Sequence, residues 1–69
     1  MYFMDLMHAI SDDCKVDGEF FDFNEKKMYR FKNLTFEKVL ELDEKYRYSR
    51  VDWFNATRKN KVTVSCTVH

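Results

Sequence analysis

Hydrophobic and polar positions repeat with two different periods along this chain, and each period predicts one kind of element. Apolar residues at positions 3, 6, 7 and 10 have helical spacing, so the pattern predicts a helix over residues 2–14. A second apolar stripe predicts a helix over residues 36–47, with Thr35 as its N-cap. Alternation of apolar and polar residues in other stretches predicts strands.

The alternating stretches form two predicted β-hairpins. The first covers residues 19–32, and the second covers residues 50–68 with a basic turn over residues 57–61. Valines alternate with hydroxyl side chains over residues 62–68, so one face of that strand is expected to be buried. Cys66 falls on the same face as the valines and is expected to be a core thiol.

The aromatic residues of the first hairpin predict how its strands face each other. Phe21 and Phe23 lie on one face of the first strand, and Tyr29 and Phe31 lie on one face of the second. Pairing these two faces favours aromatic contact across the strands. Asp22 is then expected on the opposite face.

The predicted order of elements is α-ββ-α-ββ. We therefore expect an α+β fold, with one small antiparallel sheet of two hairpins and two helices on one face. A chain of 69 residues is expected to form a single compact domain over residues 1–69, whose core relies on twelve aromatic residues. The only glycine, Gly18, follows Asp17 and predicts a turn there.

No segment predicts export or membrane insertion. The apolar start of the chain is interrupted by Asp5 and lacks a basic region, and no apolar run approaches the roughly 18 residues that a membrane span needs. We therefore expect a cytoplasmic protein without membrane contact, whose two cysteines remain thiols. A disulfide between Cys14 and Cys66 is the alternative.

Charge is sorted along the chain although its net value is zero. Residues 1–25 carry seven acidic residues and one basic residue, whereas residues 26–69 carry five acidic and eleven basic residues. If the two halves stay apart in the folded protein, each sign forms a face that binds partners of the opposite sign. The expected acidic face consists of Asp12, Asp13, Asp17, Glu19 and Asp22, with Phe20 among them.

This acidic face predicts a protein-binding module, since acidic residues around an aromatic side chain suit a basic groove on another protein. The alternative is a solvated face that only keeps the protein soluble. In general character, the short chain without proline resembles accessory proteins of bacteriophages. That resemblance implies a protein that acts in the host cytoplasm and inhibits or redirects a host enzyme, such as one that handles nucleic acid or serves in defence.

A second hypothesis is nucleic-acid binding by the basic second hairpin. Basic residues interleaved with aromatic residues can contact phosphates and stack on bases. The zero net charge weakens this hypothesis, because nucleic-acid-binding domains usually carry a positive excess. The candidate residues are Arg47, Arg50, Arg58, Lys59, Lys61 and Trp53.

A third hypothesis is self-association. An exposed strand edge in a small sheet can pair with its own copy, and the strand over residues 62–68 is the candidate for such a homodimer.

Neither metal binding nor catalysis is expected. His8, Cys14, Cys66 and His69 are zinc-ligand types, but the first two do not have standard spacing and Cys66 belongs to a buried strand face. A calcium loop is excluded because Lys15 occupies a position that needs an oxygen ligand. No phosphate-binding loop or nucleophile motif occurs, so we expect neither an enzyme nor a cofactor.

Overall fold

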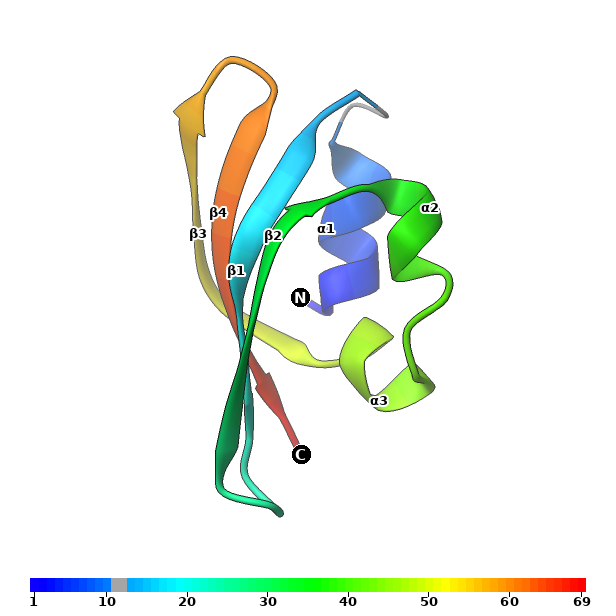
Figure 1. The fold of residues 1–69 in the computed structure, drawn as a ribbon, viewed down its shortest axis with the longest axis vertical. Coiled ribbons are helices and arrows are strands. Elements are labelled where there is room, and N and C mark those ends of the chain that lie inside the picture. The colour runs from blue at the N-terminus through cyan, green and yellow to red at the C-terminus, as the bar shows by residue number, and fades with distance from the viewer. Residues whose placement is uncertain (11–12) are drawn as a thin grey trace.

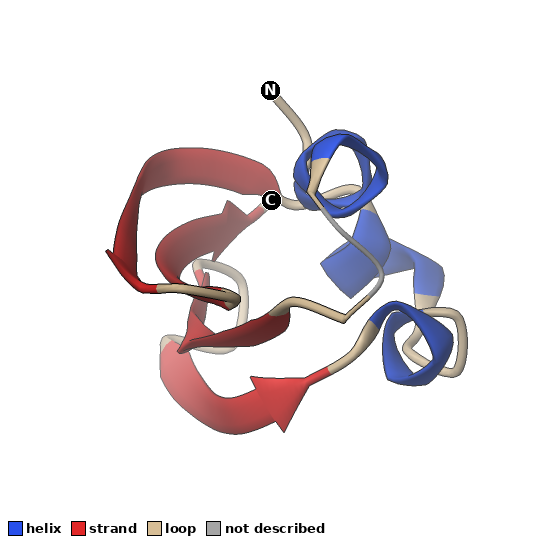
Figure 2. Ribbon diagram, turned by 90° about the horizontal axis from the view of Figure 1, so that it is seen from above, coloured by secondary structure: helices blue, strands red, loops and turns tan. Residues whose placement is uncertain are grey.

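The computed structural model describes residues 1–10 and 13–69, and of residue 57 only the backbone. Within these residues the helices and strands are α1 (Phe3–Ala9), β1 (Lys15–Asp22), β2 (Lys27–Leu34), α2 (Phe36–Val39), α3 (Glu44–Arg47), β3 (Arg50–Arg58) and β4 (Lys61–Val68). The helices lie on one side of a four-stranded sheet, and no described helix covers its other side (Figure 1, Figure 2). The α+β fold expected from the sequence is confirmed.

The strand order is β2-β1-β4-β3, and both predicted hairpins are present. The sheet is mixed rather than wholly antiparallel, because β1 and β4 pair in parallel at its centre. The chain leaves β2 at one edge, passes through α2 and α3 on the helical side, and enters β3 at the opposite edge (Figure 1). β4 then returns to the centre, so the prediction that residues 62–68 offer a free edge for a homodimer is wrong. The edge strands are β2 and β3.

The hydrophobic core fills the space between the helices and the sheet. Phe3 is fully buried in α1, and its ring packs edge-on against Phe20 of β1 at a centroid distance of 5.2 Å. Phe20 also contacts Phe31 of β2 at 4.8 Å and Tyr46 of α3 at 5.1 Å. Cys66 is fully buried in β4, which confirms the predicted core thiol.

The first hairpin is one residue out of the predicted register. Phe20, and not Phe21, faces the helices, and it pairs with Tyr29 across the strands. The carboxylate of Asp22 accepts hydrogen bonds from the backbone N–H groups of residues 24 and 25, at 3.0 and 3.2 Å, and so turns the chain immediately after β1. Because side chains alternate along a strand, a shift of one residue moves each of them to the other face.

The turn predicted at Asp17 and Gly18 is wrong, since both residues lie inside β1. The pairing with β2 shifts between Val16 and Gly18, which marks a β-bulge rather than a chain reversal. Glycine is needed there because β4 approaches closely, as described below.

Both predicted helices are shorter in the structure. α1 ends at Ala9, because Ile10 adopts an extended conformation with ψ 164°. The helix predicted over residues 36–47 is divided into α2 and α3, since Asp43 is extended with ψ 148°. The break allows Leu42 and Tyr46 to pack against the core together.

The predicted N-cap of the second helix is confirmed, because the Thr35 hydroxyl accepts a hydrogen bond from the backbone N–H of Lys38 at 3.4 Å. The second hairpin has a shorter turn than predicted, formed by Lys59 and Asn60. Asn60 has a left-handed φ of 63°, which asparagine tolerates better than most residues. No helix among the described residues has the length and apolar character to cross a membrane.

Candidate functional site

The uncovered side of the sheet, called the open face below, collects side chains from all four strands. Directly opposed residues point to the same side of a sheet, and neighbours along a strand point to opposite sides. Val16, Phe20, Val64 and Cys66 point toward the core, so the register fixes which residues occupy the open face. These are Lys15, Asp17, Glu19 and Phe21 of β1, Met28 and Arg30 of β2, Arg50, Trp53, Asn55 and Arg58 of β3, and Lys61, Thr63, Ser65 and Thr67 of β4.

Trp53 is the largest side chain on this face, and it is 53% exposed. Beside it lies a depression of about 270 Å³, whose lining includes Glu19, Arg30 and Thr63. The next residue, Phe54, pairs with Val64 and therefore points to the helical side, where it is 50% exposed. The open face thus presents a flat aromatic surface next to a shallow hollow with a cation in its wall.

A second group of rings lies beyond the end of β1. Phe21 packs edge-on against Phe23 at a centroid distance of 5.3 Å. Phe23 in turn lies nearly parallel to the imidazole ring of His69, at 6.2 Å and 11°. Phe23 is 59% exposed, so this group adds further ring surface that solvent can reach.

Cations outnumber carboxylates on the open face. Lys61 forms an ion pair with Asp17 at 3.1 Å. The Nε of Arg50 lies 3.1 Å from a carboxylate oxygen of Asp52, whose other oxygen accepts a hydrogen bond from the Thr67 hydroxyl. Arg58 forms no ion pair with another described residue. The set includes Lys15, Arg30, Lys32, Arg50, Arg58 and Lys61 against Asp17, Glu19 and Asp52, so the face carries a positive excess.

Most of the predicted basic set comes together on this face. Arg50, Trp53, Arg58 and Lys61 belong to it, and Lys59 lies in the adjoining turn. Arg47 does not, because it lies in α3 on the helical side. Its Nε is buried without a hydrogen-bond partner among the described residues, and its guanidinium carbon lies 5.9 Å from the centre of the Tyr48 ring.

The predicted acidic face is not a single surface. Phe20 and Asp22 are only 4% and 1% exposed, so their placement on an accessible face is wrong. The one-residue register difference in the first hairpin turns both toward the helices. Asp17 and Glu19 lie among the cations of the open face.

Two further members of that set precede β1 in the sequence. Asp13 is exposed before β1, and Asp12 lies outside the described residues. A role for any of these acidic residues in partner binding stays a prediction.

The pKa values of two of these carboxyls show that they are held in their charged forms. Burial raises the pKa of Asp22, but hydrogen bonds from the Glu25 backbone, the Lys45 ammonium and the Asn24 backbone outweigh it, so the pKa lies below its ordinary value. The Lys45 ammonium lies 3.3 Å from Asp22, and this hydrogen bond raises the pKa of Lys45. This pair ties the end of the first hairpin to α3.

Asp17 links three strands on the open face. The backbone N–H of Asn33 donates to its carboxylate at 2.8 Å, and this hydrogen bond, helped by Lys61, lowers the pKa of Asp17 despite partial burial. Lys61 also donates to the side-chain oxygen of Asn33 at 3.3 Å. The negative charge of Asp17 is therefore compensated within the sheet rather than offered to a partner.

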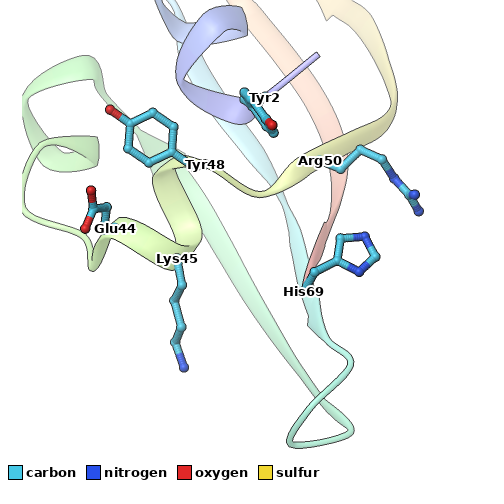
Figure 3. A pocket seen from close by; sticks show the side chains of 6 residues that line it. All are labelled: Tyr2, Glu44, Lys45, Tyr48, Arg50 and His69. Carbon is cyan, nitrogen blue, oxygen red and sulfur yellow. The ribbon is translucent and has the colours of Figure 1, made fainter.

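A larger hollow of about 500 Å³ lies at the start of β3 (Figure 3). Arg50 and His69 stand on one side of it, and Glu44, Lys45 and Tyr48 stand on the other. Its two cations already face the carboxylates of Asp52 and Asp22. Both cations of this hollow are thus paired, whereas the open face also carries Arg58, which forms no ion pair with another described residue.

The candidate metal ligands do not assemble, since no group of three or more His, Cys, Asp or Glu side chains suited to a metal ion occurs in the described part of the chain. His8 packs against Phe36, and His69 stacks on Phe23. Burial raises the pKa of the Cys66 thiol to about 12, so this thiol is unsuited to nucleophilic chemistry at neutral pH.

Sequence reasoning missed Arg30 and Asn55 as residues of this surface. The signal was present in the alternation of charged and apolar residues over residues 15–21. Interpreting Asp17 and Gly18 as a turn concealed that alternation. Comparisons of this chain with protein-family models, with curated proteins and with solved structures find no match.

Proposed function

We propose that the open face binds single-stranded nucleic acid, with Trp53 stacking on bases and Arg50, Arg58 and Lys61 contacting phosphates. The observation that carries this proposal is a half-exposed tryptophan on an uncovered sheet face, among basic residues of the same and the neighbouring strand. Aromatic platforms flanked by cations bind single strands with little sequence preference, because every base has a flat face on which a ring can stack.

The carboxylates on the same face favour weak, salt-sensitive binding. Asp17 and Asp52 already neutralise part of the positive charge, so few cations remain for phosphates. If three phosphates are contacted, the logarithm of the binding constant should fall with the logarithm of salt concentration with a slope of about −2. Binding should therefore be measured first at low salt.

Trp53 gives this test a built-in reporter, because it is the only tryptophan in the chain. Titration with single-stranded DNA, single-stranded RNA and duplex DNA at low salt should quench or shift tryptophan fluorescence with both single strands more than with the duplex. Absence of any change with all three, together with unchanged anisotropy of the labelled oligonucleotides, would rule out the proposal.

A pair of variants separates the two sides of β3. Trp53→Ala should weaken single-strand binding about tenfold or more, since it removes one stacking contact. Phe54→Ala is the matched control, because Phe54 is equally exposed on the same strand but points to the helical side. Equal losses in the two variants, measured by oligonucleotide anisotropy, would contradict stacking on the open face.

A second pair tests the phosphate contacts. Arg58→Ala should weaken binding to all sequences alike and make the salt slope shallower by about 1. Lys38→Ala, which removes the same charge on the helical side in α2, should leave both quantities unchanged. Docking of an acidic face on a basic partner protein, the function expected first from the sequence, is less well supported, because Asp22 and Phe20 are buried.

A further inference from the structure

The outer edge of β3 is free over most of its length. The N-terminal residues cover only its beginning, where the backbone N–H of Val51 donates to the Met1 carbonyl at 2.9 Å and Tyr2 bridges to Arg50. From Asp52 to Arg58, no described strand pairs with this edge. Trp53 and Phe54, on the two sides of that free segment, are both about half exposed.

We propose that this segment of β3 pairs antiparallel with the same segment of a second copy of this chain, about a two-fold axis at Asn55. The two sheets then form one continuous sheet across the dimer. Two identical strands that pair about a two-fold axis necessarily run antiparallel, and each residue makes the same contact in both copies. The inference does not rest on the proposed nucleic-acid binding, because the free edge of β3 carries it, but Arg58 belongs to both surfaces.

The alternation of side chains restricts the register of such a pair. When the axis is perpendicular to the sheet, the open faces of the two copies lie on the same side. Residues that oppose each other must then both point to the open face or both to the helical side. In the regular segment, Trp53 and Asn55 point to the open face, and Phe54 and Ala56 point to the helical side. The two-fold axis must therefore be placed so that one residue lies directly opposite the same residue of the other copy.

Charge selects the residue on the axis. With Asn55 at the centre, Asp52 of each copy lies opposite Arg58 of the other, which gives two complementary pairs. Within its own chain, Asp52 lies 3.1 Å from the Nε of Arg50 and accepts a hydrogen bond from Thr67, whereas Arg58 forms no ion pair with another described residue. With Phe54 at the centre, Arg50 would oppose Arg58, and like charges directly opposite each other destabilise a strand pair.

The same register also covers the exposed Phe54 ring on the helical side. Phe54 of one copy lies opposite Ala56 of the other, so a large side chain meets a small one at both ends of the contact. Burial of the half-exposed Phe54 ring removes apolar surface from water, which favours association. The free edge, the complementary charges and the exposed ring all lead to the same partner, a second copy of the chain.

Sedimentation equilibrium without nucleic acid tests the dimer, and a cysteine placed on the axis tests its register. Asn55→Cys should form a disulfide-linked dimer under mild oxidation, because residue 55 opposes itself. Ala56→Cys is the matched control, since it opposes Phe54 and should not crosslink to itself. The natural thiols of Cys14 and Cys66 are buried, so they should not interfere.

Arg58→Glu tests the charge complementarity, because it places like charges opposite each other at both ends of the contact. This variant should raise the dimer dissociation constant about tenfold, whereas Lys59→Glu, with the same change in net charge, should not. Sedimentation as a monomer up to high-micromolar concentration would overturn the dimer. Equal effects of the two glutamate variants, or equal crosslinking at positions 55 and 56, would overturn this register.

Discussion

Gly18 lies where β1 and β4 approach too closely for any side chain. A Cβ atom at this position would lie 2.1 Å from the carbonyl oxygen of Val64 and 2.8 Å from its Cγ1. The backbone conformation itself does not require glycine, because φ is not positive there. Glycine is therefore needed because the two central parallel strands, β1 and β4, leave no room for a side chain at this position.

Gly18→Ala should destabilise the protein by about 1–3 kcal/mol, because the added methyl group meets a backbone atom that cannot move without disturbing the sheet. Urea unfolding followed by circular dichroism measures the loss. Ser65→Ala in β4 adds no atoms and serves as the control. A free energy of unfolding as high for Gly18→Ala as for the wild type would show that β1 and β4 can separate at this point without cost.

At the scale of elements, Asp22 determines how the first hairpin is built. One of its carboxylate oxygens accepts two loop N–H groups, and the other accepts the Lys45 ammonium at 3.3 Å. The hairpin end is thereby fixed both to its own loop and to α3. This buried acid also explains the register, because the turn must begin where its carboxylate can reach the loop.

The stability of this arrangement should depend on pH. The pKa of Asp22 is lowered in the folded protein, so its contribution is present above the unfolded pKa of about 3.9 and is lost as pH falls through the lower folded value. Asp22→Asn should be less stable than the wild type at neutral pH and should lose less stability on acidification. Urea midpoints measured between about pH 2 and pH 7 give the comparison.

Asp43→Asn is a suitable control for that experiment, because the Asp43 side chain makes no capping hydrogen bond to a described residue. Its urea midpoint should follow the wild-type dependence on pH. An Asp22→Asn protein whose stability falls with pH as steeply as that of the wild type would contradict the role given to this carboxyl.

The elements that could be predicted are those whose pattern is local. The β4 strand, the Thr35 cap and the existence of both hairpins follow from alternation and capping, and all are present. The side of the sheet on which Phe20 lies could not be predicted, because it depends on hydrogen bonds between Asp22 and its loop. The parallel pairing of β1 with β4 could not be predicted either, since it depends on which edge of the sheet the chain enters after α3.

The candidate site, too, could be predicted only in part. The basic residues of β3 and β4 were identified from composition, but their common face depends on the register with β1. The acidic set was predicted from proximity in sequence alone. Proximity along a strand places successive residues on opposite sides of the sheet, and this is why Asp22 is buried while Glu19 lies on the open face.

At the scale of the whole molecule, acidic residues from the first third of the chain form ion pairs with basic residues from the remainder. Asp17 and Asp22, from the acidic first third, are bound by Lys61 and Lys45 from the basic remainder. The separation of charge along the sequence thus serves contacts between distant segments. The acidic side chains that were expected to bind a partner are in these two cases bound by the protein's own lysines.

Lys61→Met tests one of these contacts, because it keeps an apolar stem and removes the charge. The variant should lose about 0.2–1 kcal/mol of unfolding free energy at low salt, as is usual for partly exposed pairs, and less at high salt. Lys38→Met, whose lysine forms no ion pair with another described residue, should change little at either salt concentration. Urea unfolding at two salt concentrations makes the measurement, and equal effects of the two variants would show that the Asp17 pair contributes nothing.

The parallel pair of β1 and β4 has a consequence for biosynthesis. Its partners, such as Lys15 and Lys61, are separated by most of the chain, whereas each hairpin closes locally. The first hairpin can therefore form while the ribosome is still translating, but the sheet is completed only after the last strand has emerged. Until then Val16 and Phe20 lack the neighbour strand that shields them, so stalled translation products of this protein should be prone to aggregate.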